Sequence, residues 1–280
     1  MRPLHVELTE RDTAFLRENL RWFSAVFNRY HDVCIAGLER LPPGRALVVG
    51  NHNGGTSTPD MFALMIAYWE RYGVESPAYG LAHDLVFRVP LLGALLRRAG
   101  ALPAGHRSAL AALAADAKVL VYPGGDLDAY KPSSRRHEVI FGGRKGFIRL
   151  ALRAGAPIVP VVSVGAHESF HVITDGSGFA RASGWKRLTR MEVIPVIVGL
   201  PWGLWVGPIP HLPPPLKMRV RVLDPISWPE LDASAADDDA VVTRCYEQVR
   251  ATMQSALDEL VREGDFGRRP LREVIAASLR

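Results

Sequence analysis

Short, mostly apolar runs rich in small and β-branched residues alternate along this sequence with segments of helical periodicity, and this alternation limits the possible folds. The clearest runs cover residues 45–51, 118–122 and 157–164, and each leads into a turn that contains glycine. Nearly continuous apolar strands are typical of parallel sheets that are covered on both faces by helices. We therefore expect an α/β fold, with a mixed, mostly parallel sheet flanked by helices.

The same pattern predicts a single domain over residues 1–280. Apolar side chains recur every three or four residues across 9–31, which predicts an N-terminal amphipathic helix on a core of about 33–225. A second long amphipathic pattern predicts C-terminal helices over about 237–279. Residues 217–223 alternate polar and apolar side chains, which indicates an edge-like strand with one solvated face.

Composition narrows the possible partners and compartments. A net charge of +5 over 280 residues favours anionic partners, but no recognition helix or zinc-finger spacing points to nucleic acid. Residues 1–10 have no apolar core of signal-peptide length, so we do not expect export. We interpret Cys34 and Cys245, the only cysteines, as buried structural thiols in the reducing cytoplasm.

One apolar stretch has the length of a membrane span. Residues 193–216 contain no Asp, Glu, Lys or Arg, yet their seven prolines would break a spanning helix. Trp202 and Trp205 suggest an irregular segment that presses into a membrane interface. A hydrophobic loop folded under the domain is an equally open interpretation.

The first run ends in a loop that carries titratable residues. Residues 46–60 read Ala-Leu-Val-Val-Gly-Asn-His-Asn-Gly-Gly-Thr-Ser-Thr-Pro-Asp, and Thr58-Pro59 predicts a helix N-cap followed by its first residue. Open α/β sheets place their chemistry beyond the carboxyl ends of strands, so His52 is a candidate general base and Asp60 its candidate orienter. Gly54-Gly55 would let the backbone approach a ligand closely. By spacing alone, a loop histidine and a helix-dipole carboxylate remain equally open.

The second run leads into Pro123-Gly124-Gly125, where glycines can present backbone N–H groups to an oxyanion. Basic residues follow, for which a solvated loop and phosphate contact are both open: Lys131, Arg135, Arg136, Arg144 and Lys145.

His167-Glu168-Ser169-Phe170-His171 matches the zinc-protease pattern His-Glu-x-x-His. That pattern requires a helix that places both imidazoles on one face. Here it follows a β-branched run and Gly165, so we expect no metal site. A zinc metallohydrolase that uses His167, Glu168 and His171 remains the alternative enzyme class.

Together these blocks resemble the glycerophosphate and lysophospholipid acyltransferase superfamily, including its diacylglycerol-acyltransferase-like branch. Residues 48–60 are similar to the catalytic His…Asp motif, although seven residues separate His52 from Asp60 where the family usually has four. Residues 100–107 are similar to a second motif that ends in a substrate-contacting arginine, here Arg107. Residues 121–126 and 156–161 stand at the third and fourth motifs.

The resemblance implies transfer of a fatty acyl group from acyl-CoA, a co-substrate, to a lipid hydroxyl, with no cofactor. It implies that His52 is the general base and that Asp60 orients it. It also implies substrate contacts, which we expect from Asn51, Gly54, Gly55, Arg107, Pro123, Gly124, Gly125, Arg144 and Lys145.

The third motif departs from the family pattern, because Leu127 stands where the family usually has an arginine. This favours an acceptor with little charge near its hydroxyl, among lysophospholipids, diacylglycerols and related alcohols. We expect a peripheral protein on the inner face of the cell membrane. A catalytically degenerate, membrane-associated lipid-binding protein is the non-enzyme alternative.

Overall fold

The structure, a computed structural model, describes residues 8–278. Residues 1–7, on which the expectation about export partly rests, and residue 279, the expected end of the C-terminal helices, lie outside the described residues. The strands of the central sheet are β1 (Asp32–Ala36), β2 (Ala46–Gly50), β3 (Ala78–Ala82), β4 (Ala101–Pro103), β5 (Lys118–Val121), β6 (Ile158–Val164), β10 (Leu216–Val222) and β11 (Gly267–Arg268). They lie in the order β1-β10-β6-β2-β5-β3-β4, with β11 beside β10. The β10 pairings with β6 and β11 are antiparallel and the others are parallel.

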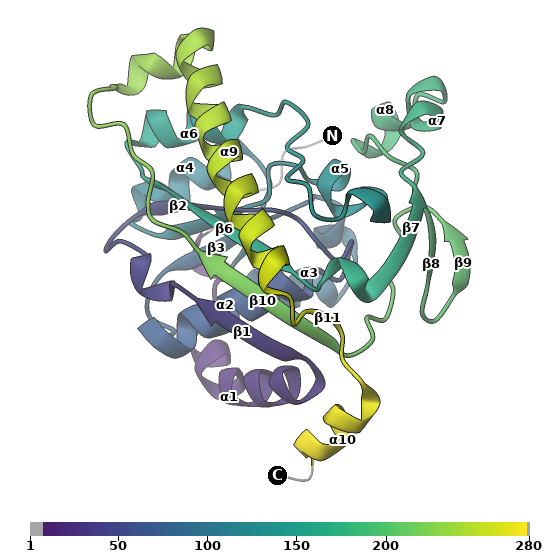
Figure 1. Cartoon of the computed structure of the whole chain (residues 1–280). Helices are drawn as coiled ribbons and strands as arrows, with labels where there is room; N and C mark the ends of the chain where they lie inside the picture. The colour runs from purple at the N-terminus through teal and green to yellow at the C-terminus, as the bar shows by residue number, and fades with distance from the viewer. Residues whose placement is uncertain (1–7, 279–280) are drawn as a thin grey trace.

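Helices cover both faces of this sheet (Figure 1). The helices are α1 (Thr13–Tyr30), α2 (Pro59–Tyr72), α3 (Leu92–Arg98), α4 (His106–Ala114), α5 (Asp126–Ala129), α6 (Gly146–Ala154), α7 (Ser177–Ala182), α8 (Trp185–Thr189), α9 (Asp239–Glu263) and α10 (Leu271–Ser278). Leu47 and Val49 of β2 belong to the core formed with α4, α6 and α9, whereas Ala46 and Val48 belong to the core formed with α2. The predicted α/β class, with a mostly parallel mixed sheet and flanking helices, is confirmed.

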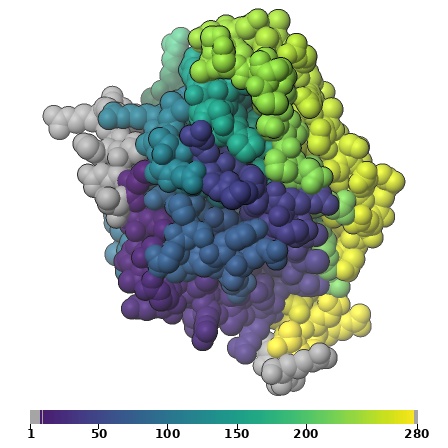
Figure 2. Space-filling view, turned by 90° about the vertical axis from the view of Figure 1, so that its left-hand side faces the viewer, coloured from purple at the N-terminus to yellow at the C-terminus, as the bar shows by residue number. Residues whose placement is uncertain are grey.

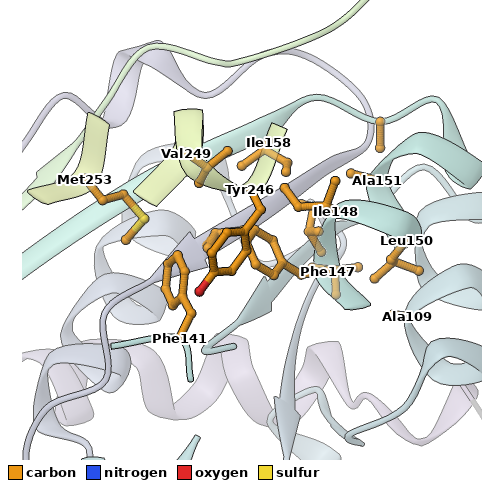
Figure 3. Packing of buried hydrophobic residues seen from close by; sticks show 14 of the residues in the cluster. Ala109, Phe141, Phe147, Ile148, Leu150, Ala151, Ile158, Tyr246, Val249 and Met253 are labelled. Atoms are coloured by element: carbon orange, nitrogen blue, oxygen red, sulfur yellow. The ribbon is translucent and has the colours of Figure 1, made fainter. Parts of the chain in front are cut away.

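The larger core lies between the sheet and α6 and α9. Figure 3 shows Tyr246 and Val249 of α9 pointing toward Phe147 and Ile148 of α6. The ring centroids of Phe147 and Tyr246 lie 6.1 Å apart, and Phe141 packs edge-on against both rings. This packing fixes the loop that precedes α6.

The N-terminal helix meets the C-terminal end of the chain. The segment after α9 crosses back to α1, where Arg269 Nη1 donates to the carbonyl oxygen of Arg29 at 2.7 Å. Figure 2 shows this yellow segment beside the purple N-terminal helix at the base of the molecule. The predicted N-terminal and C-terminal helices are therefore both present, and α1 begins at Thr13 after an Asp12 cap.

Three local expectations are wrong. Residues 217–223 do not form an edge strand, because β10 pairs with β1 on one side and β6 on the other. Its polar face is half-buried, and Arg221 is ion-paired with Glu263 of α9. Cys34 is exposed because it lies on the solvent side of the edge strand β1, whereas Cys245 is buried as expected. Thr58 precedes α2 but gives it no side-chain cap, since its backbone is left-handed with φ of 36°.

The proline-rich stretch 193–216 belongs to a second, smaller sheet. This antiparallel sheet contains β7 (Phe170–Thr174), β8 (Val196–Gly199) and β9 (Gly203–Val206), in that order. Its inner residues Phe170, Ile197 and Trp205 pack with Tyr130 in one buried cluster. Among residues 8–278, no helix has both the length and the apolar character needed to cross a bilayer.

Candidate active site

The predicted site residues gather at one edge of the central sheet. β2, β3, β4, β5 and β6 run parallel, so their carboxyl ends share an edge. His52 follows β2, Pro123 follows β5 and Arg107 follows β4. β4 lies three strand positions from β2, so the ends of these two strands are roughly 14 Å apart along the edge.

His52 is fixed through its backbone. Its amide N–H donates to Asp128 Oδ2 at 2.5 Å, and its ring packs on Tyr122 with centroids 4.9 Å apart. Nδ1 is buried and has no hydrogen-bond partner in the described structure. Burial lowers the pKa of His52 to about 4, and the negative charge of Asp128 opposes this shift. The imidazole is therefore neutral at pH 7 and able to accept a proton.

The Asp60 carboxylate is bound by a residue that the sequence interpretation missed. Ser163 Oγ on β6 donates to Asp60 Oδ2 at 2.6 Å, and the amide of Met61 donates to Oδ1 at 3.0 Å. Burial raises the pKa of Asp60 to about 6, and the Ser163 hydrogen bond opposes the rise. No hydrogen bond joins Asp60 to His52 in the described residues, so the expected direct pairing is not formed in this structure.

Ser163 also holds the His52 loop from both sides. Asn51 accepts from the Ser163 amide at 2.8 Å and donates to its carbonyl oxygen at 3.1 Å. Asn53 Nδ2 donates to the Ser163 carbonyl oxygen at 3.0 Å and to Oγ at 2.9 Å. Both asparagines are almost completely buried. Asn51, expected to contact substrate, is instead occupied in joining the loop to β6.

The glycine pair is required by the fold of the loop. Gly54 and Gly55 have φ of 75° and 57°, which favour glycine. A Cβ on Gly54 would lie 2.6 Å from Pro59 Cδ, and one on Gly55 would lie 2.8 Å from Phe170 Cε1. The close approach that we expected toward a ligand is therefore made to protein side chains.

A buried ion pair lies beneath the His52 loop. Lys131 Nζ and Asp128 Oδ1 are 2.7 Å apart, and neither side chain has any solvent exposure. Asp128 Oδ1 also accepts from the amide of Ile140 at 3.3 Å, and Lys131 donates to the carbonyl oxygen of Glu138 at 3.0 Å. The two roles left open for Lys131, a residue of a solvated loop and a phosphate ligand, are therefore both wrong. An Asp and a Lys three residues apart in a charged segment gave no signal of this role.

The turn after β5 is closed by internal contacts. The Gly125 amide donates to the Tyr122 carbonyl oxygen at 3.0 Å, so this N–H is not free for an oxyanion. Arg144 donates to the Gly124 carbonyl oxygen at 2.7 Å and forms ion pairs with Asp126 and Glu192. Its role in holding an anionic ligand is thus replaced by a role in holding this turn. Pro123 and Gly124 are buried in the turn.

The remaining two cations differ in their availability. Lys145 Nζ donates to Thr243 Oγ1 of α9 at 2.7 Å, which ties α6 to α9. Arg107, in the first turn of α4, is exposed and has no ion pair in the described structure. Of the cations expected to bind substrate, Arg107 is therefore the one placed to meet an external anion.

The His-Glu-x-x-His pattern lacks the helix that zinc binding needs. His167 and Glu168 lie in a 3-10 turn, His167–Ser169, whereas His171 lies on β7. His167 is buried and His171 is exposed, so their imidazoles do not share a helix face. The described residues contain no group of three potential ligands that could hold a metal ion.

Comparison with known proteins identifies acyltransferases among the proteins similar to this chain. The Acyltransferase family model matches residues 32–164, from β1 to the end of β6. An uncharacterized protein of Mycobacterium tuberculosis (strain H37Rv) is 32% identical over 251 residues, which are 89% of this chain and 66% of that protein. A Mus musculus protein, "DGAT1/2-independent enzyme synthesizing storage lipids", is 28% identical over 188 residues, covering 66% of this chain and 54% of the relative.

A solved structure shares the fold. The crystal structure of the 1-acyl-sn-glycerophosphate (LPA) acyltransferase PlsC from Thermotoga maritima aligns with a TM-score of 0.53 and 17% identity, over 88% of this chain and 79% of that one. The chain belongs to the glycerophosphate and lysophospholipid acyltransferase superfamily. It spans about two-thirds of the length of its mycobacterial relatives and about half of the mouse protein.

Proposed function

We propose that the protein transfers a fatty acyl group from a thioester donor, acyl-CoA, to the hydroxyl of a membrane lipid. The observation that carries this proposal is a neutral His52 held by its backbone at the carboxyl edge of the sheet, with Nδ1 buried. The family membership and the lipid-synthesising mouse relative support an acyl group and a lipid acceptor.

In the proposed reaction, His52 Nε2 accepts the proton of the acceptor hydroxyl while that oxygen attacks the thioester carbonyl. The carbon–sulfur bond then breaks, and the departing sulfur takes the proton back from the imidazolium. Asp128 stabilises the imidazolium by its negative charge. Asp60 acts with Ser163 as a positioning pair that keeps the loop in place.

The acceptor that fits best has little charge beside its hydroxyl, because Arg144 is neutralised by two carboxylates. Diacylglycerols and similar alcohols meet this condition. Arg107 would bind the phosphates at the far end of the donor, since the separation of β4 from β2 suits an extended pantetheine arm. The protein would work peripherally, on the cytoplasmic face of the cell membrane.

The test is thiol release from a labelled acyl-CoA in the presence of candidate acceptors. We expect His52→Ala to lower turnover by roughly 10²–10⁴-fold with an unchanged melting temperature. Ser163→Ala and Asp60→Asn should lower activity together and should not add in the double variant, because they act as one pair. Wild-type turnover in His52→Ala would refute the mechanism. A wild-type protein that binds lipid but releases no thiol with any acceptor would support the lipid-binding alternative.

A further inference from the structure

The small sheet of β7, β8 and β9 is apolar on both faces. Its inner row, Val172, Ile197 and Trp205, is buried in the cluster around Tyr130. Its outer row pairs His171 with Val198 and Val198 with Leu204, and all three side chains are exposed. An antiparallel sheet with one solvated face normally alternates apolar and polar residues.

The exposed apolar surface extends beyond the paired row. Leu200 and Trp202 form the turn between β8 and β9, and Val206 lies at the end of β9; each is more than half exposed. Ile209 and Leu212 continue it along the following segment. Figure 1 shows β8 and β9 projecting from the body of the molecule. We define the outer face as these residues with Val198 and Leu204.

Two basic helices connect β7 to β8. The chain passes from β7 to β8 through α7 and α8, and residues 177–190 carry four cations and no carboxylate. Arg181 and Arg187 are exposed and have no ion pair in the described residues, and Phe179 and Leu188 are 68% and 83% exposed beside them. Cations interleaved with exposed apolar side chains suit an anionic lipid surface.

The small sheet also contacts the loop that carries His52. Phe170 of β7 lies against Gly55, and Ser57 Oγ donates to the carbonyl oxygen of His211, in the segment that leaves the sheet, at 2.9 Å. We propose that the outer face docks on an anionic lipid bilayer, with Trp202 and Leu204 in the interface and Arg181 and Arg187 on its headgroups. This rests on the proposed function, because docking brings the His52 loop to the membrane that holds the acceptor.

Cosedimentation with vesicles of phosphatidylcholine, with and without phosphatidylglycerol, tests this docking. We expect Val198→Asp/Leu204→Asp to weaken vesicle binding by at least about tenfold. Arg181→Gln/Arg187→Gln should weaken only the phosphatidylglycerol-dependent binding, by about fivefold for each cation. The matched control is Trp22→Asp/Val26→Asp on α1, which changes two apolar side chains of similar exposure, 61% and 46%.

Equal binding by the outer-face variant and the wild type would overturn the proposal, as would a loss confined to the α1 control. A wild-type dimer that the outer-face variant converts to monomer, with vesicle binding unchanged, would assign the face to a second copy instead. Circular dichroism and thermal melting check that each variant folds. Acyl transfer to an acceptor dispersed in detergent separates the two proposals, because this assay needs no vesicle. If the wild type transfers no acyl group in detergent, the proposed acyltransferase activity is refuted, but docking is not. Vesicle binding tests docking alone.

Discussion

Replacing Lys131 with methionine should destabilise the protein strongly. The change keeps most of the side-chain volume and removes the ammonium that faces Asp128 at 2.7 Å, where neither side chain is exposed. Breaking a buried pair from one side leaves an uncompensated buried charge, which costs about 3–5 kcal/mol. For a chain of this size, we expect the melting temperature to fall by roughly 10 °C.

Urea unfolding and thermal melting measure this loss. The matched control is Arg135→Met, since Arg135 and Glu138 form an ion pair with the same spacing but with both side chains about half exposed. An exposed pair of this kind contributes no more than about 1 kcal/mol. The double variant Asp128→Leu/Lys131→Met should be more stable than Lys131→Met, because it leaves no charge unpaired. A loss below about 1 kcal/mol for Lys131→Met would refute this reasoning.

Three further predictions concern the loop, the donor and pH. Gly55→Ala should lower the free energy of unfolding by about 2 kcal/mol more than the control Gly73→Ala. Both glycines have positive φ, but only a Cβ at position 55 would lie against Phe170. Urea unfolding of the two variants measures the difference. Arg107→Ala should raise the KM for acyl-CoA several-fold without changing that for the acceptor, whereas Arg45→Ala, at the opposite edge of the sheet, should change neither in steady-state assays. Burial lowers the pKa of His31, His52 and His211 to about 4 and raises that of Asp60 to about 6. Between pH 6 and 5 the unfolded chain therefore binds about two more protons than the folded chain, and stability should fall by roughly 3 kcal/mol over this pH unit as pH drops. A free energy of unfolding, measured with urea, that does not change with pH would contradict this.

The sequence predicts those parts of the fold that depend on local pattern. The apolar runs become β2, β5 and β6, and the helix expected at Pro59 begins there. The position of a strand within the sheet, by contrast, depends on contacts with residues far along the chain. Residues 217–223 have the alternation of an edge strand, yet β10 is internal because it pairs with β1 and β6. Its polar face meets α9, where Glu263 pairs with Arg221.

The candidate site shows the same division. His52 could be predicted because a histidine after a buried strand is a local pattern, and Ser163 had a weak signal as the only polar residue in β6. Asp128 had none, since its contact with the His52 amide joins residues that are 76 positions apart. The sequence alone predicts ligand contacts for Arg144 and Lys145, because their partners, Glu192 and Thr243, lie far along the chain.

These long-range contacts change how the histidine is understood. The expected site has a carboxylate on the imidazole ring, but here two buried carboxylates hold the backbone around it. Asp128 binds the His52 amide, and Asp60 binds Ser163, which in turn fixes Asn51 and Asn53 on either side. The ring thus keeps its position without using either nitrogen. A base held in this way can offer Nε2 to the reaction, because the loop does not depend on the protonation state of the ring.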